Sequence, residues 1–78
     1  MDVFRSPQLL EGFFVHDQDS ASDPAYYGYV NVRGAWYILE QNVAAGTFRY
    51  CRGLSDYSTS WTGRGGLTYG YLNAIFAT

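Results

Sequence analysis

The stretch Tyr26-Tyr27-Gly28-Tyr29-Val30-Asn31-Val32 decides the fold, together with two aromatic runs that follow it. These runs are Trp36-Tyr37-Ile38-Leu39 and Phe48-Arg49-Tyr50-Cys51. Aromatic and β-branched residues dominate all three, which is typical of strands, and the dipeptides Arg33-Gly34 and Ala45-Gly46 lie between them at hairpin spacing. The sequence therefore predicts a three-stranded antiparallel meander within residues 26–53.

Two-residue loops at both glycine dipeptides would fix the register of this meander, pairing Val30 with Tyr37 and Gln41 with Tyr50. Because side chains alternate across a strand, one face then carries Tyr26, Val30, Val32, Tyr37, Leu39, Val43, Phe48 and Tyr50. The other face carries Tyr27, Tyr29, Trp36, Ile38 and Cys51, with Asn31, Glu40, Asn42 and Arg49 at its margin. A slip of one residue in either turn would exchange these sets, so the prediction of two apolar faces is firmer than the choice of the inner one.

The C-terminal residues 54–78 are predicted to form one helix that begins near Ser55-Asp56 and ends about Phe76. Its glycines oppose a helix by up to ~1 kcal/mol each, whereas the spacing of its apolar residues favours one. Small residues recur along a second stripe, which predicts a groove where another backbone packs closely. The groove residues are Gly63, Gly66, Gly70 and Ala74. They would face the sheet aromatics or a helix of a neighbouring subunit.

Residues 1–25 lack a helical period and combine an apolar patch with a polar stretch, so we expect an extended N-terminal arm. The predicted fold is thus α+β: residues 26–78 form a small domain in which a three-stranded antiparallel β-meander packs on one C-terminal α-helix. The arm would cover the second sheet face or reach a neighbouring subunit.

Composition excludes several functional classes. With 78 residues, one cysteine (Cys51) and one histidine (His16), the chain cannot form an intrachain disulfide, and no metal or cofactor is expected. The net charge is -2 and lysine is absent, so nucleic acid is an unlikely default partner. The first residues lack a secretory signal and no apolar run could span a bilayer. We therefore expect a soluble protein.

No group of residues indicates catalysis. Residues 17–28 lack the oxygen ligands, glycine and terminal glutamate of a calcium loop. His16 and Asp17 are adjacent, and neighbouring side chains rarely point at one another as a base and its orienting acid must. The segment 63–66 contains glycines and Arg64 but neither nucleotide-binding fingerprint. We expect a protein that is not an enzyme.

The apolar faces instead favour assembly. In this hypothesis Tyr27, Tyr29, Trp36 and Ile38 anchor a partner, and Glu40 and Arg49 set its register. The arm residues Phe4, Leu9, Leu10, Phe13 and Phe14 would insert into an adjacent subunit. An alternative is a binding module that stacks single-stranded nucleic acid or carbohydrate on the tyrosine-rich face. Local pairing of Arg49 with Glu40 is the simpler explanation for that arginine.

The order of these aromatic motifs resembles a pattern in small proteins encoded by tailed bacteriophages. The matching segments are Tyr26-Tyr27-Gly28-Tyr29-Val30, Trp36-Tyr37-Ile38, Phe48-Arg49-Tyr50, Tyr57-Ser58-Thr59-Ser60-Trp61, Leu67-Thr68-Tyr69-Gly70-Tyr71 and Phe76. The resemblance spans about residues 26–76. It implies a virion component made in the host cytoplasm, such as a head, neck or tail accessory or decoration subunit, whose partners are other virion proteins and copies of itself. It implies no catalytic residue.

Overall fold

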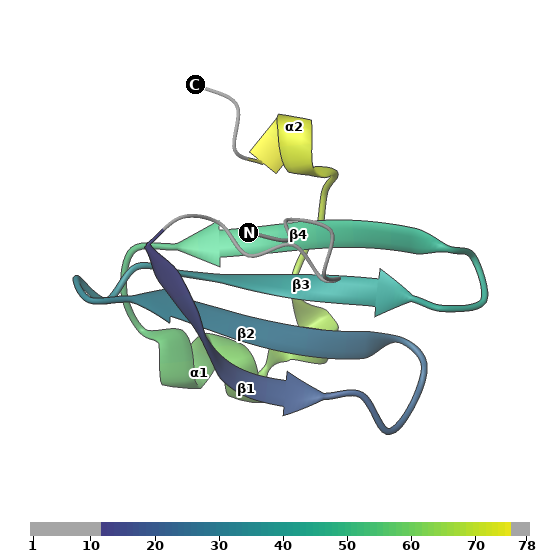
Figure 1. Ribbon diagram of the computed structural model, residues 1–78, viewed down its shortest axis with the longest axis horizontal. Coiled ribbons are helices and arrows are strands. Elements are labelled where there is room, and N and C mark those ends of the chain that lie inside the picture. Colours follow the sequence, from purple (N-terminus) through teal and green to yellow (C-terminus); the bar gives the residue numbers. More distant parts are fainter. Residues whose placement is uncertain (1–11, 76–78) are drawn as a thin grey trace.

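The chain forms one antiparallel sheet of four strands, which follow one another in sequence order. The computed structural model describes residues 12–75, apart from the side chains of Asn73 and Ala74. The strands are β1 (Phe13–Asp19), β2 (Ala25–Asn31), β3 (Trp36–Asn42) and β4 (Thr47–Gly53). The helices are α1 (Tyr57–Thr62), the 3-10 helix η1 (Arg64–Gly66) and α2 (Leu72–Ile75). Figure 1 shows α1 behind the sheet and α2 beyond β4. The broad α+β prediction is confirmed.

The first strand lies within the segment predicted to be an arm, so the prediction of three strands is wrong. β1 pairs with β2 from Phe13 opposite Asn31 to Asp19 opposite Tyr26, and its register shifts between Val15 and Asp17. This bulge interrupts the alternation of apolar and polar side chains, which is why the strand is hard to recognise in the sequence. In Figure 1, β1 runs diagonally across the sheet. The predicted arm residues Phe4, Leu9 and Leu10 lie outside the described residues.

The turn between β2 and β3 holds three residues instead of the predicted two. The amide of Asn31 donates to the carbonyl of Ala35 (2.9 Å), and the Asn31 Oδ1 accepts from the amides of Arg33 (2.9 Å) and Ala35 (3.0 Å). Gly34 has a φ of 92°, in the left-handed region that favours glycine. Tyr29 therefore lies opposite Tyr37. The predicted register is wrong by one residue, which exchanges the two faces of β2.

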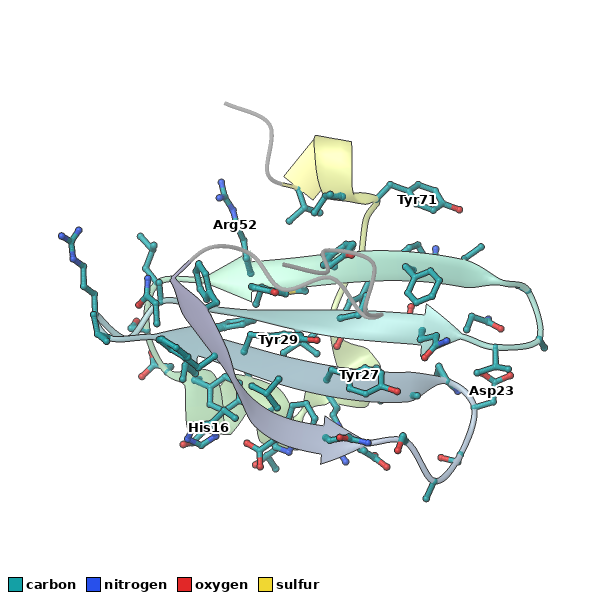
Figure 2. All side chains as sticks on the ribbon, viewed as in Figure 1. His16, Asp23, Tyr27, Tyr29, Arg52 and Tyr71 are labelled. Atoms are coloured by element: carbon teal, nitrogen blue, oxygen red, sulfur yellow. The ribbon has the colours of Figure 1, made fainter. Side chains whose placement is uncertain are left out.

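The β3–β4 loop spans residues 43–46, and its register differs from the predicted one by two residues. Gln41 lies opposite Phe48. The Asn42 Oδ1 accepts from the amide of Ala45 (3.0 Å), and the carboxylate of Asp23 accepts from the amides of residues 43 (2.7 Å) and 44 (3.1 Å). Figure 2 shows Asp23 beside this loop. A shift of two residues restores side-chain direction, so the predicted faces of β3 and β4 relative to each other are confirmed.

The front face of the sheet carries the hydrophobic core. Tyr29 and Tyr37 stack with ring centroids 4.4 Å apart, and both are buried. The buried members of this core are Tyr29, Tyr37, Leu39 and Tyr50, and partly buried Phe13, Tyr27, Leu72 and Ile75 pack against it. Phe13 sets its ring edge against Tyr37, with centroids 5.1 Å apart. The start of β1 and α2 therefore both contribute to covering this face.

The back face is covered by α1 and the segment that leads to it. The indole N–H of Trp36 donates to the carbonyl of Ser55 (2.6 Å), and its ring lies 6.3 Å from that of Tyr57. Trp36 also lies directly over Gly53, which is its partner on β4. Trp36 is only 5% exposed. Both faces of the meander are thus covered within one chain.

The C-terminal region does not form the predicted single helix. The helix α1 ends at Thr62, and Gly63 closes it by donating its amide to the carbonyl of Thr59 (3.1 Å). Gly66 belongs to η1, while Gly70 lies in an extended stretch and exchanges two backbone hydrogen bonds with Tyr50 (2.6 and 2.9 Å). The low helix propensity of glycine outweighs the apolar period here.

The predicted small-residue groove consequently does not form. Gly63 follows α1, Gly66 ends η1, Gly70 lies in the extended stretch that pairs with Tyr50, and position 74 belongs to α2. They share no helical face. Gly70 instead lies close to Ile75, where an added Cβ would meet its side chain at 3.0 Å.

We predict that Gly53→Ala destabilises the protein by about 1–3 kcal/mol, because the new methyl group would overlap the buried indole of Trp36. Gly65→Ala is the matched control, since no atom lies within 4 Å of a Cβ built there. Urea unfolding followed by tryptophan fluorescence measures both. Equal stability of the Gly53 variant and the wild type would contradict the packing of Trp36 on β4.

Candidate interaction surface

The residues predicted to anchor a partner are divided between the two faces of the sheet. Tyr27 and Tyr29 lie on the front face, whereas Trp36 and Ile38 lie on the back face. Tyr29, Trp36 and Ile38 are buried and Tyr27 is half-buried. Little of these side chains is left for another protein to contact. A single aromatic interface made by all four is therefore not what the structure presents.

The Glu40 and Arg49 pair predicted to set register lies within the chain. The two residues are opposite each other on β3 and β4, and the Arg49 Nη2 lies 3.5 Å from the Glu40 Oε1. The hydroxyl of Tyr26 donates to the other carboxylate oxygen of Glu40 (3.3 Å). The local pairing predicted for Arg49 is confirmed, and it leaves Glu40 mostly buried.

A polar cluster joins β1 to α1. The hydroxyl of Tyr57 donates to the Asp17 Oδ2 (2.8 Å), and the Nδ1 of His16 lies 2.8 Å from the same oxygen. The expectation that the adjacent His16 and Asp17 side chains do not meet is thus wrong. Bonding from His16, and less strongly from Tyr57, lowers the pKa of the Asp17 carboxyl against the opposing effect of desolvation.

Tyr57 acts in this cluster as a neutral donor. Burial raises the pKa of its hydroxyl, and the bond to Asp17 raises it further, so the hydroxyl keeps its proton. The His16 ring rests edge-on against the Tyr57 ring, with centroids 5.1 Å apart. Figure 2 shows His16 on β1, on the side of the sheet where α1 lies. The cluster holds α1 against the sheet, and its carboxylate is already engaged.

Arg64 makes the equivalent connection for η1. Its Nη2 lies 2.7 Å from the Asp19 Oδ2, and its Nη1 donates to the carbonyl of Trp61 (2.8 Å). Its guanidinium carbon lies 4.4 Å from the centre of the Trp61 ring and 5.8 Å from that of Tyr26. Arg64 is thus committed to internal contacts instead of to a phosphate. Asp17 and Asp19 thus lie on the edge strand β1 and contact α1 and η1, although their sequence context predicts a solvated loop.

Four exposed apolar side chains lie toward the end of the sheet that holds the β2–β3 turn. We define the apolar end surface as Phe14, Val15, Val32 and Leu54. Val32 is 90% exposed, Leu54 is 86% exposed, and Phe14 and Val15 are each 60% exposed.

The register places the apolar end surface where the β2–β3 turn lies. Phe14 pairs with Val30, which pairs with Trp36, which in turn pairs with Gly53, so this row crosses the sheet just inside that end. Val32 follows β2 and Leu54 follows β4, and both strands finish at the left of Figure 1. Of the predicted interface residues that the structure describes, Phe14 alone lies in this surface. Sequence reasoning missed Val32 because a two-residue turn would have placed it on a sheet face.

Comparison with protein-family models, curated proteins and solved structures finds no match. Within residues 12–75, no helix is long and apolar enough to cross a membrane. The same described part of the chain contains no group of three His, Cys, Asp or Glu side chains placed to ligate a metal ion. Burial raises the pKa of the Cys51 thiol, which disfavours the reactive thiolate.

We predict that Asp17→Asn lowers the free energy of unfolding by about 1 kcal/mol at neutral pH, a modest value because the carboxylate is partly exposed. A carboxyl whose pKa is lowered by folding stabilises the protein above its unfolded pKa, and this contribution is lost as the pH falls through the folded value. The difference between the variant and the wild type should therefore shrink toward about pH 3. Urea unfolding at both pH values measures it.

Tyr57→Phe is the companion variant, because it removes the hydroxyl donor and keeps the ring. Because the two side chains share a hydrogen bond, the double variant should lose less stability than the sum of the two single variants. Strict additivity would contradict the contact.

Proposed function

We propose that this chain is a non-enzymatic structural subunit that works by protein–protein contact. The observation that carries the proposal is the apolar end surface, in which Val32 and Leu54 are almost fully exposed although the chain buries both faces of its sheet. Single exposed apolar residues are common on monomers, whereas a group of them at one place is typical of an interaction site. The carboxylates of Asp17 and Asp19 are bound by Tyr57 and Arg64 within the chain, so they do not support a catalytic role.

The particular setting we propose is a tailed-bacteriophage particle, in which the chain is a head, neck or tail accessory or decoration protein. The support for this setting is the resemblance carried by the aromatic motifs of residues 26–76. A small domain that covers its own sheet and leaves one end apolar suits a subunit that attaches to other virion proteins and to copies of itself. The chain would reach the virion from the host cytoplasm.

The alternative of a stacking module has less support. Such a module needs exposed aromatic rings beside basic groups. Tyr29, Tyr37 and Tyr50 are instead buried in the front-face core. Tyr71 is 55% exposed but stands apart near α2, as Figure 2 shows. With a net charge of -2, the chain also lacks a positive field to attract a polyanion.

We predict that the chain is a stoichiometric part of purified particles of the phage that encodes it. Particles banded on a density gradient and analysed by quantitative mass spectrometry should contain the chain at a fixed ratio to the major capsid or tail protein. The chain should remain after a salt wash, because apolar contacts resist salt. Recovery of the chain solely in the particle-free fraction would contradict the proposal.

A further inference from the structure

We propose that the apolar end surface binds a second copy of this chain, giving a symmetric homodimer about a two-fold axis. The inference rests on the proposed assembly function and names the partner of that same surface. In a two-fold contact the same patch is used by both copies, so the patch must be complementary to itself. The fixed positions of the apolar side chains and the two opposite charges beside them meet this requirement.

Two of the three chain segments that carry the surface, the β2–β3 turn and the segment after β4, are held in place by contacts within the chain. Val32 belongs to a turn that the Asn31 side chain fixes through two backbone amides. Leu54 lies between Gly53, which is packed under Trp36, and Ser55, whose carbonyl accepts the Trp36 indole N–H. A surface that is already ordered loses less entropy on binding. The apolar side chains are therefore presented in a geometry suited to association.

Two opposite charges flank the surface and make no ion pair within the described chain. Arg33 lies at the exposed tip of the β2–β3 turn, and its guanidinium forms no hydrogen bond or salt bridge within residues 12–75. Asp56 lies beyond Leu54 at the start of α1, where it makes no side-chain cap of the helix. Within residues 12–75 its carboxylate accepts a hydrogen bond from the Ser55 hydroxyl at 3.5 Å.

A two-fold axis through the apolar residues brings these charges together. Arg33 of each copy then faces Asp56 of the other copy, and two ion pairs form at the rim of the contact. A partner of different sequence would need its own matching charges, whereas a second copy supplies both of them. This self-complementarity favours the homodimer over other occupants of the surface.

The opposite end of the sheet lacks this combination. It exposes Val43, but the nearby carboxylate of Asp23 is taken up by two amides of the β3–β4 loop. The outer edge of β4 is likewise occupied where Tyr50 pairs with Gly70. Val43 therefore offers a matched control position, since it is an exposed valine in a hairpin loop at the far end of the sheet.

The test is sedimentation equilibrium of the full chain over a wide range of concentrations, with Val32→Asp, Leu54→Asp and the control Val43→Asp. We expect the wild type and the control to form dimers. In each of the other two variants the dimer dissociation constant should rise by about 30-fold or more, and a 30-fold rise corresponds to ~2 kcal/mol of binding free energy. Near-ultraviolet circular dichroism checks that each variant remains folded. A monomeric wild type, or equal loss of dimer in the control, overturns the inference.

A second set of variants tests the rim ion pairs. Arg33→Glu should weaken the dimer, because it places two carboxylates against each other on each side of the two-fold axis. Adding Asp56→Asn should recover part of the loss by removing that repulsion, and asparagine tolerates the positive φ of 61° at this position. No recovery in the double variant contradicts the two-fold arrangement.

The outcomes separate this inference from the proposed function. A monomeric chain that is nevertheless a fixed component of particles overturns the homodimer and leaves the structural role intact, with another virion protein on the surface. A dimeric chain that is absent from particles supports the homodimer and overturns the role.

Discussion

The turn that joins β2 to β3 is the constraint on which the rest of the structure depends. One side-chain oxygen of Asn31 accepts from two backbone amides, and Gly34 supplies the left-handed residue that closes a three-residue turn. This turn sets Tyr29 opposite Tyr37 on the front face and Val30 opposite Trp36 on the back. A turn one residue shorter would move every side chain of β2 to the other face. The stacked tyrosines and the contact of Trp36 with α1 both follow from it.

Much of the meander could be predicted from the sequence, because strand composition and glycine turns are local signals. The strands β2, β3 and β4 lie where aromatic and β-branched residues indicate them, and the pairing of Arg49 with Glu40 follows from their places on adjacent strands. The turn lengths are less well determined, since side-chain hydrogen bonds from Asn31 and Asn42 add to the backbone ones and hold turns longer than two residues. The first strand is concealed by its bulge.

The candidate surface was the hardest part to predict, because it depends on what the chain covers by itself. Trp36, which the sequence predicts to anchor a partner, instead packs within the chain against the segment around α1. The sequence predicts a long helix for that segment, yet its glycines divide it into short pieces: α1 lies behind the sheet, Gly70 pairs with β4, and α2 packs on the front-face core. Val32 and Leu54 remain exposed at the turn end, and both lie just outside the strands, whereas the alternation along residues 26–32 assigns Val32 to a sheet face.

The central claim is that the three-residue turn fixes the register between β2 and β3, and solution NMR tests it most directly. In an antiparallel pair, opposed residues that do not exchange hydrogen bonds bring their Cα atoms to about 4.5 Å, which gives strong contacts between their α protons. The claim predicts such nuclear Overhauser contacts between Val30 and Trp36 and between Gly28 and Ile38. Contacts that instead join Asn31 to Trp36 and Tyr29 to Ile38, as a two-residue turn would give, would contradict it.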